Sequence, residues 1–176
     1  MNYNPLQMDK LRRDIQIVFQ DPYGSLNPRL TIGQALQEVV EKYSPLNDRR
    51  GKVYKLINDV QLSADIYFSY PHELSGGQRQ RACIARALAV GPKVLICDEI
   101  ISALDISVQS KILNLILDLK SEYDLGILFT THDLKVVRAI SDGILIMSKG
   151  RIVERGTSDE IFNNPKHMYT KKLLSS

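Results

Sequence analysis

The sequence has few of the features that mark secreted or membrane-spanning chains. Among its 176 residues there are two cysteines and no tryptophan, and no apolar run reaches the roughly 18 residues that a membrane-spanning helix needs. The amino terminus lacks the basic-then-apolar layout of a secretory signal, so we expect none. Cys83 and Cys97 lie inside apolar segments without metal-ligand spacing. We therefore expect reduced core thiols of a cytosolic protein and no disulfide scaffold.

Net charge and hydrophobic content argue against two further classes, nucleic-acid binders and disordered chains. The formal net charge is only +3, and charged residues make up 24% of the chain. No long basic block occurs, so nothing in the composition indicates a nucleic-acid partner. Hydrophobic residues make up 44%, which is typical of a folded globular chain and argues against intrinsic disorder.

The hydrophobic pattern predicts an α/β fold. The run Val94-Leu95-Ile96-Cys97 is wholly apolar, as in a parallel strand buried on both faces. The helices expected before about residue 90 look like an insertion into the sheet. Asp105 is placed to cap the helix that follows it, and Thr157 with Glu160 forms a capping box before a last helical region. We expect strands at 14–19, 94–97, 126–130, 143–147 and 151–154, and helices at 31–43, 53–60, 75–88, 106–121 and 134–140.

The most informative segment is 74–81, Leu-Ser-Gly-Gly-Gln-Arg-Gln-Arg. Ser75 and Gln78 have capping-box spacing, so a helix should begin here. Gly76 and Gly77 each weaken a helix by about 1 kcal/mol relative to alanine. They allow close backbone approach, so that free N–H groups and the positive end of the helix dipole can meet an anion. The alternative is a flexible helix start; with this context we favour phosphate contact.

Two carboxylates follow the buried strand at 94–97. Asp98 and Glu99 are expected at the carboxyl edge of the sheet, where α/β proteins bind ligands. Asp98 is suited to holding Mg²⁺ through water, and Glu99 to orienting or deprotonating a water that attacks a phosphate. The alternative is an acidic loop at a strand end.

Other polar residues follow neighbouring strands. His132 comes just after the strand at 126–130 and is suited to contacting a γ-phosphate or an attacking water, although a lone histidine there is more often structural. Gln20 ends the first strand and has an amide oxygen for a metal ion or water; it is equally acceptable as a turn residue. The segment 102–105 is explained locally as a helix cap.

Taken together and in this order, these elements resemble the ATP-binding cassette (ABC) transporter ATPases. Gln20 matches the Q-loop, 74–78 the signature motif, 94–99 Walker B, 102–105 the D-loop and His132 the switch histidine. The resemblance covers essentially the whole chain. It implies ATP and Mg²⁺ as cofactors, catalytic roles for Glu99 and His132, metal binding by Asp98 and Gln20, and nucleotide contacts from the Q-loop, signature and D-loop residues: Gln20, Ser75, Gly76, Gly77, Gln78 and Asp105.

Two stretches are similar to one subfamily, the oligopeptide, dipeptide and nickel importer ATPases. They are 20–28, Gln-Asp-Pro-Tyr-Gly-Ser-Leu-Asn-Pro, and the tail at 164–174, where Met168 replaces the usual proline. The resemblance implies an ATPase subunit at the cytoplasmic face of the cell membrane. Its partners would be a second cassette and membrane permease subunits, with no nucleic acid.

The family's P-loop, G-x-x-x-x-G-K-[ST], does not occur in this sequence. Gly51-Lys52 is the only Gly-Lys pair, but Val53 follows it and Leu46 stands where the first glycine belongs. We interpret the chain as the C-terminal two-thirds of a P-loop NTPase cassette, cut off upstream of the Q-loop. A split gene and a degenerate paralogue are the alternatives. The strand that leads into the P-loop belongs to the middle of the sheet, so we expect a gap in the core and exposed apolar edges at 94–97 and 127–129.

A second departure is Ile100-Ile101, where the subfamily usually has proline and a small or polar residue; it leaves the turn after Glu99 unpredicted. We expect one partial cassette over 1–176, with a helical subdomain at about 27–90 and core strands, switch histidine and tail at 91–176. The function that follows is the ATPase subunit of an importer for peptides or similar solutes. A non-catalytic subunit that donates only its signature motif, and a non-transport ABC ATPase, stay open, as do the cargo and the identity of the partner cassette.

Overall fold

The computed structural model describes residues 4–43 and 48–175. The amino terminus, for which no secretory signal is expected, lies partly outside these ranges. The chain divides into two compact units, Met1–Thr130 and Thr131–Ser176. Each unit is described by itself.

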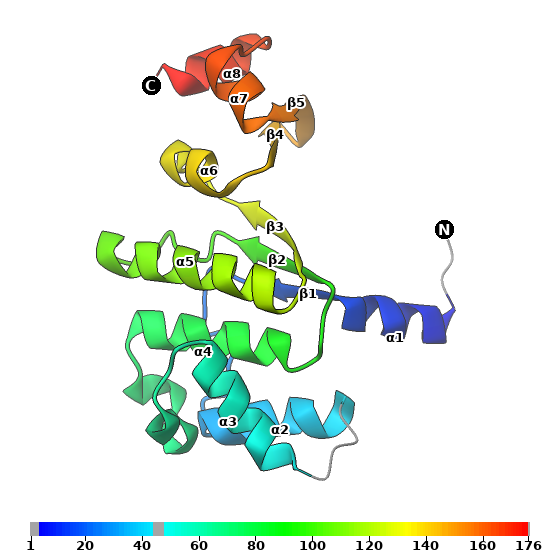
Figure 1. Cartoon of the computed structure of the whole chain (residues 1–176), viewed down its shortest axis with the longest axis vertical. Helices are drawn as coiled ribbons and strands as arrows, with labels where there is room; N and C mark the ends of the chain where they lie inside the picture. Colours follow the sequence, from blue (N-terminus) through cyan, green and yellow to red (C-terminus); the bar gives the residue numbers. More distant parts are fainter. Residues whose placement is uncertain (1–3, 44–47, 176) are drawn as a thin grey trace. The chain divides into compact units, whose positions relative to one another are not determined.

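The first unit is built on a three-stranded parallel sheet (Figure 1). Its strands are β1 (Ile15–Val18), β2 (Val94–Asp98) and β3 (Gly126–Thr130), and they lie side by side in that order. Ile15 pairs with Val94, and Val94 pairs with Gly126. Helix α5 (Ile106–Glu122) forms the crossover between β2 and β3. The expected α/β class with a parallel sheet is confirmed.

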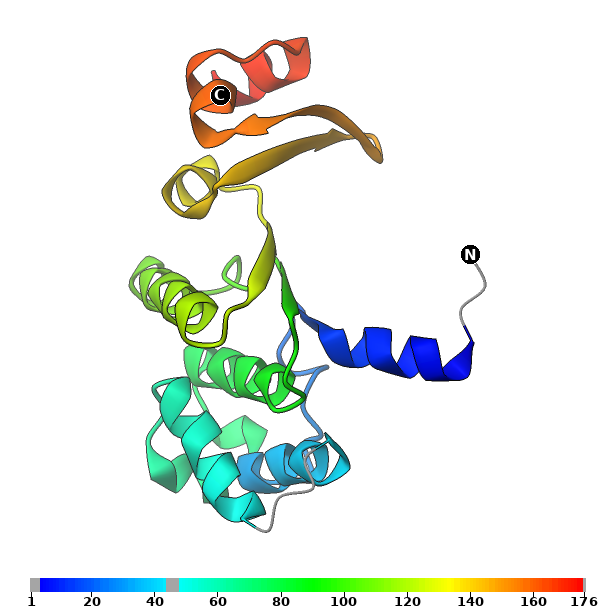
Figure 2. The same cartoon turned by 45° about the vertical axis from the view of Figure 1, so that its right-hand side comes forward.

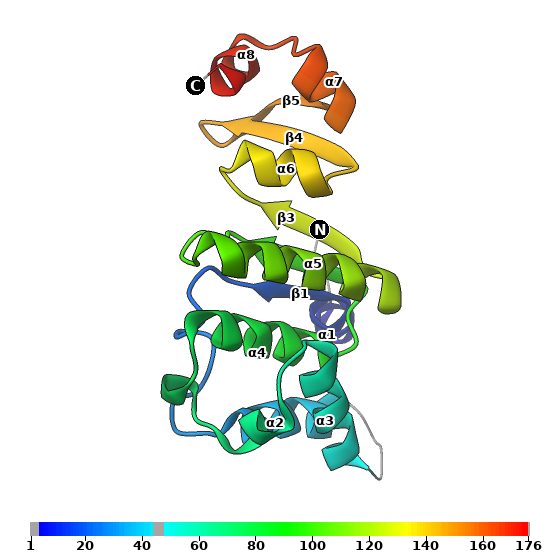
Figure 3. The ribbon, with the colours of Figure 1, turned by 60° about the vertical axis from the view of Figure 1, so that its left-hand side comes forward.

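Most of the remaining helices of this unit lie in the sequence between two adjacent strands. They are α2 (Ile32–Tyr43), α3 (Arg49–Asp59), the short 3₁₀ helices η1 (Ala64–Phe68) and η2 (Pro71–Glu73), and α4 (Gly76–Leu88). Because β1 pairs directly with β2, this whole segment is inserted into the sheet topology. Figures 1 and 3 show α2 and α3 gathered beyond α4, on the side away from the strands.

The core of the first unit is formed by the apolar stripes that the sequence predicted. On α5 the buried side chains recur at helical spacing, at Ile112, Leu115, Ile116 and Leu119. On α4 the buried residues include Ala82, Ala85 and Leu88. Together with the fully buried Leu95 and Cys97 of β2, they remove from water the apolar surface that stabilises the unit.

Of the two strands expected to have an exposed apolar edge, the prediction was wrong for the one at 94–97. The strand at 94–97 is the central strand of the three, so both of its edges are paired. β3, by contrast, pairs with β2 alone among the described residues, and its Leu128 is 48% exposed. An edge strand with an apolar outer residue was therefore correctly expected only at 127–129.

Helix α1 (Pro5–Asp14) was not predicted. It begins with a capping box in which Asn4 and Gln7 exchange side-chain and backbone hydrogen bonds, and none of its residues is buried. In Figure 2 it projects from the start of β1. A helix without a buried face has no strong apolar period, so the hydrophobic pattern did not reveal it.

The second unit is an antiparallel hairpin with three helices. The strands of the hairpin are β4 (Gly143–Ser148) and β5 (Arg151–Thr157). The helices are α6 (Leu134–Ile140), α7 (Ser158–Asn163) and α8 (Met168–Leu174). Lys149 and Gly150 both have positive φ at the hairpin turn, and Thr157 caps α7 as expected. In the part of the chain that the structure describes, no helix has the length and apolar character to cross a membrane.

Candidate functional site

The parallel register brings Gln20, Asp98 and Glu99 to one edge of the sheet. Val18 pairs with Cys97, so the chain leaves β1 toward Gln20 at the edge where it leaves β2 toward Glu99. Gln20 and Asp98 are exposed, and Glu99 is half-buried. This is the carboxyl edge, where parallel α/β sheets bind ligands, as the sequence predicted.

Glu99 has an unusual backbone conformation that its neighbours hold in place. Its φ is +49°, in the left-handed region. Its N–H donates to both the carbonyl oxygen and the hydroxyl of Thr130, each at 3.2 Å. Its carbonyl oxygen accepts from the N–H of Ser102 at 3.1 Å and from the Ser102 hydroxyl at 2.9 Å. These bonds offset the roughly 1–2 kcal/mol that a left-handed residue costs.

The Ile100-Ile101 pair, which left this turn unpredicted, anchors it. Both side chains are buried, at 1% and 3% exposure. Two large apolar residues on the buried side and the Ser102 bonds on the other keep the turn closed. The apolar replacement is therefore compatible with a fixed Glu99 backbone.

The signature segment begins helix α4 as predicted. Ser75 is the N-cap: its hydroxyl accepts from the Gln78 N–H at 3.3 Å, and the Gln78 side chain accepts from the Ser75 N–H at 2.9 Å. The two glycines have a packing role that the sequence did not reveal. A β-carbon on Gly77 would lie 2.6 Å from Val108 Cγ1, and one on Gly76 would lie 3.3 Å from Leu104 Cδ2.

The expected cap by Asp105 was only half right. Asp105 occupies the N-cap position of α5, but its side chain makes no capping hydrogen bond; its carbonyl oxygen accepts from the Val108 and Gln109 N–H groups. The loop before it is held instead by Gln109, whose amide donates to the carbonyl oxygens of Ile101 at 3.1 Å and Leu104 at 2.9 Å. The Asp105 carboxylate is thus not used as a cap.

Gln20 and the start of α4 line one cavity of about 350 Å³, together with Leu104 of the loop before α5. Two residues of the Gln-Arg-Gln-Arg run tie α4 to the segment around Gln20. The buried Gln80 donates its amide to the Phe19 carbonyl at 3.4 Å, and the Arg79 guanidinium lies 4.0 Å from the ring centroid of Tyr23. Their place in the Gln-Arg-Gln-Arg run directly after the two glycines is the sequence signal for these contacts.

His132 belongs to the second unit, where it is exposed. The segment around it is ordered by short-range bonds: the Asp133 N–H donates to the Thr131 hydroxyl at 3.1 Å, and the Asp133 carboxylate accepts from the Lys135 N–H at 2.8 Å to cap α6. The placement of His132 against Glu99 stays a prediction.

The donor chemistry at the sheet edge fits Mg²⁺. Asp98 offers a carboxylate and Gln20 an amide oxygen, and Mg²⁺ takes oxygen ligands while retaining several waters. Within 4–43 and 48–175, no three histidine, cysteine, aspartate or glutamate side chains gather into a metal-holding group. A metal ion at this edge would therefore complete its shell from water and phosphate rather than from a protein cage.

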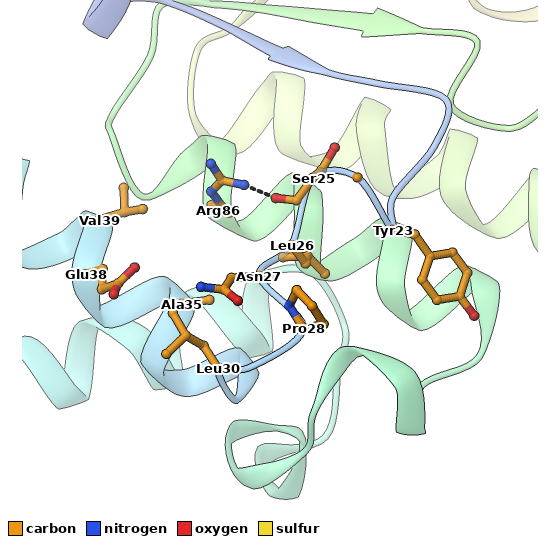
Figure 4. A pocket seen from close by; sticks show the side chains of 11 residues that line it. Tyr23, Ser25, Leu26, Asn27, Pro28, Leu30, Ala35, Glu38, Val39 and Arg86 are labelled. Carbon is orange, nitrogen blue, oxygen red and sulfur yellow. Dashed lines mark hydrogen bonds between the residues drawn. The ribbon is translucent and has the colours of Figure 1, made fainter.

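A second cavity, of about 480 Å³, lies beside the segment that follows Gln20 (Figure 4). It is lined by 23–28, by Ala35 and Glu38 of α2, and by Arg86 of α4. Arg86 donates to the Ser25 carbonyl and so ties this segment to α4.

The two cysteines are buried as expected, and burial raises the pKa of each thiol to about 12.

Sequence comparison finds relatives along almost the whole chain. Residues 1–102 match the ABC transporter family. The chain is 51% identical over 173 residues to the dipeptide transport ATP-binding protein DppF of Escherichia coli (strain K12), covering 97% of this chain and 52% of that protein. It is 48% identical over 175 residues to the glutathione import ATP-binding protein GsiA of Shigella flexneri serotype 5b (strain 8401), covering 98% of this chain and 28% of that protein. The chain belongs to the ABC transporter family.

Solved structures show the same fold. The cbiO1 protein of Clostridium perfringens, described as part of the ABC transporter complex cbiONQ, superposes with a TM-score of 0.82 at 31% identity, covering 93% of this chain and 64% of that one. The ATP-binding cassette MJ0796, solved as a dimer with ADP and Pi, has a TM-score of 0.73 at 28% identity, covering 89% of this chain and 68% of that one. The family resemblance and the cassette fold are confirmed. The chain spans about half of DppF and less of GsiA.

Proposed function

We propose that this chain is a part of the ATPase subunit of an ABC importer for peptides or similar small solutes, whose ATP binding also needs a P-loop. The observation that carries the proposal is the meeting of Gln20, Asp98 and Glu99 at one sheet edge, with the start of α4 lining the same cavity as Gln20. The names of its relatives, which describe dipeptide transport and glutathione import, support the choice of solute class.

In this proposal the carboxylates and His132 have separate roles. Glu99 orients or deprotonates the water that attacks the γ-phosphate. Asp98 and Gln20 hold Mg²⁺, which when bound neutralises charge on the phosphate oxygens. His132 contacts the γ-phosphate. The fixed backbone of Glu99 supports its role because a base acts only within hydrogen-bond reach of the proton it takes.

The helix start at Ser75 would serve the ATP of another cassette. Ser75, Gly76, Gly77 and Gln78 would meet a γ-phosphate that a partner chain's P-loop holds, with Asp105 at the same interface. The N-terminus of the 13-residue α4 supplies backbone N–H groups and a positive dipole end for that anion. The partner is a second cassette, identical or paralogous.

The inserted helices would face the membrane subunits of the importer. We place the permease-facing surface at about 27–90, the helical subdomain, with 91–176 supplying the other cassette elements and the chain peripheral at the cytoplasmic face of the membrane. The cavity of Figure 4 supports this assignment because the segment after Gln20 lines it. A permease segment docked in this cavity would contact the part of the chain that leads away from the nucleotide site. Cross-links from a permease coupling segment to His132 instead of to this cavity would contradict the assignment.

A second candidate function is that of a non-catalytic subunit that only donates its signature motif. The observation that favours it is the absence of a G-x-x-x-x-G-K-[ST] pattern from the sequence. Both candidates predict that the signature motif contacts the ATP of a partner cassette. They differ in whether Glu99 takes part in ATP hydrolysis.

The test mixes this chain with a P-loop-bearing dipeptide-transport cassette whose own signature serine is replaced. If the chain donates its signature, ATPase activity should return, and Ser75→Ala should reduce it. Ser110→Ala is the matched control, because the Ser110 hydroxyl donates to the Ile106 carbonyl of its own helix, α5. No recovery of activity with a folded wild-type chain would overturn the donor role. The two candidates are separated by joining the P-loop segment of a dipeptide-transport cassette to this chain: turnover that Glu99→Gln abolishes supports the first candidate, and no turnover supports the second.

A further inference from the structure

Thr130 joins the two carboxylate residues at the end of the central strand. It is the last residue of β3 and pairs in register with Asp98. Its hydroxyl donates to Asp98 Oδ1 at 2.5 Å and accepts from the Glu99 N–H at 3.2 Å. One side chain therefore contacts Asp98 through its carboxylate and Glu99 through its backbone.

A threonine is suited to this bridge for two physical reasons. A hydroxyl donates one hydrogen bond and accepts others, so it satisfies a carboxylate and an N–H group at the same time. The β-branched side chain has few χ1 rotamers, which holds the hydroxyl in one direction. The 2.5 Å distance to Asp98 is typical of the strong O–H···O⁻ bond that a charged acceptor forms.

The bridge also stabilises a backbone conformation that is otherwise unfavourable. Glu99 has φ +49°, and the Thr130 hydroxyl and carbonyl oxygen together receive its N–H. Without the hydroxyl, one of these two acceptors is lost, while Asp98 loses the donor that fixes the rotation of its carboxylate. Both changes act on the groups that hold Mg²⁺ and orient water in the proposed function.

We infer that Thr130 is the positioning residue of this carboxylate pair. Its hydroxyl fixes the direction of the Asp98 oxygens and the backbone of Glu99 from a single point. This inference rests on the proposed function, since the pair it positions is the proposed metal and water site.

The test uses the labelled chain without nucleotide. Thr130→Val removes the hydroxyl and keeps the side-chain shape, and Thr130→Ser keeps the hydroxyl. Thr31→Val is the matched control: its hydroxyl accepts from the Gln34 N–H at the start of α2, so the same substitution lowers stability without touching the carboxylates. Two quantities are measured by NMR, namely amide hydrogen exchange at Glu99 and the Mn²⁺ concentration that broadens the Asp98 and Glu99 signals.

We expect Thr130→Val to speed Glu99 exchange about fivefold and to weaken Mn²⁺ binding by a similar factor, because one hydrogen bond to each residue is lost. Thr130→Ser should stay near the wild type, and Thr31→Val should lower the melting temperature alone. Unchanged exchange or unchanged Mn²⁺ affinity in Thr130→Val would overturn the inference, and so would a Thr130→Ser variant that behaves like valine. Failure of the cassette-mixing experiment, with these Thr130 effects present, would count against the proposed function alone.

Discussion

The side chain of Val108 occupies the space that a β-carbon on Gly77 would need, at 2.6 Å from its Cγ1 atom. This contact joins the first turn of α4 to the first turn of α5. The glycine was interpreted from sequence as a means of bringing the backbone close to an anion. The structure adds a second reason for it, because the two helices approach each other here. The two roles make different predictions.

Gly77→Ala should destabilise the first unit although alanine favours helix formation. The gain in helix propensity is about 1 kcal/mol, and overpacking a close contact costs about 1–3 kcal/mol. We expect a net loss of about 1 kcal/mol in the free energy of unfolding, measured by urea denaturation. Gly76→Ala has the same propensity gain with a looser contact, 3.3 Å from Leu104 Cδ2, and should be near neutral or stabilising.

The packing reason is isolated by a double-mutant cycle. In a Val108→Ala background the clash is gone, so Gly77→Ala should there stabilise by its helix propensity alone. Equal effects of Gly77→Ala in both backgrounds would show that Val108 does not determine the glycine.

A second prediction concerns the contact between α3 and the end of α5. Asp59 accepts hydrogen bonds from Lys55 at 2.6 Å and from the Tyr123 hydroxyl. Its side chain is only 7% exposed. Tyr123→Phe leaves this carboxylate with one donor fewer and should cost about 1–3 kcal/mol of unfolding free energy, since the lost bond has a charged acceptor.

Glu122→Gln is the matched control at the same contact. Glu122 lies 3.4 Å from Lys55 Nζ, but both side chains are more than half exposed. An exposed ion pair contributes about 0–1 kcal/mol, so chemical denaturation should barely detect its loss. If Glu122→Gln costs as much as Tyr123→Phe, burial of Asp59 is not what gives this contact its strength.

Local signals predicted the helices and strands well, and they did not predict the bridge at the site. The capping boxes at Ser75 and Thr157 and the stripe on α5 each lie within a few residues of sequence, so their physics can be read directly. Helix α1 buries nothing and carried no such signal. The bond from Thr130 to Asp98 joins residues 32 positions apart and depends on strand register, which no local pattern specifies.

The buried cysteines predict a loss of stability at alkaline pH. Burial raises the pKa of Cys83 and Cys97 from 9.0 to about 12. Between about pH 9 and 12 the unfolded chain releases the thiol protons while the folded chain retains them, so the free energy of unfolding falls as the pH rises. Each thiol contributes a slope of up to about 1.4 kcal/mol per pH unit.

The measurement is urea unfolding at several pH values from about 8 to 9.5, a range in which most tyrosines and lysines keep their protons. The Cys83→Ala, Cys97→Ala double variant should be less stable at pH 8 and should show a flatter pH dependence than the wild type. An unchanged slope would mean that the thiols ionise equally in both states. Tyr123→Phe serves as the control, because the raised pKa of Tyr123, about 12, should affect stability only above about pH 10.

The last prediction concerns the purified chain by itself, which should bind Mg-ATP very weakly and hydrolyse none. Phosphate affinity in P-loop enzymes comes from converging backbone N–H groups and a lysine, and the sequence contains no G-x-x-x-x-G-K-[ST] pattern to supply them. The side chains at the sheet edge include Asp98 and Glu99, and carboxylates repel a triphosphate unless a metal ion lies between them. Calorimetry with Mg-ATP, followed by a phosphate-release assay, measures both properties. Micromolar binding together with turnover that Glu99→Gln abolishes would show that other residues of this chain replace the P-loop.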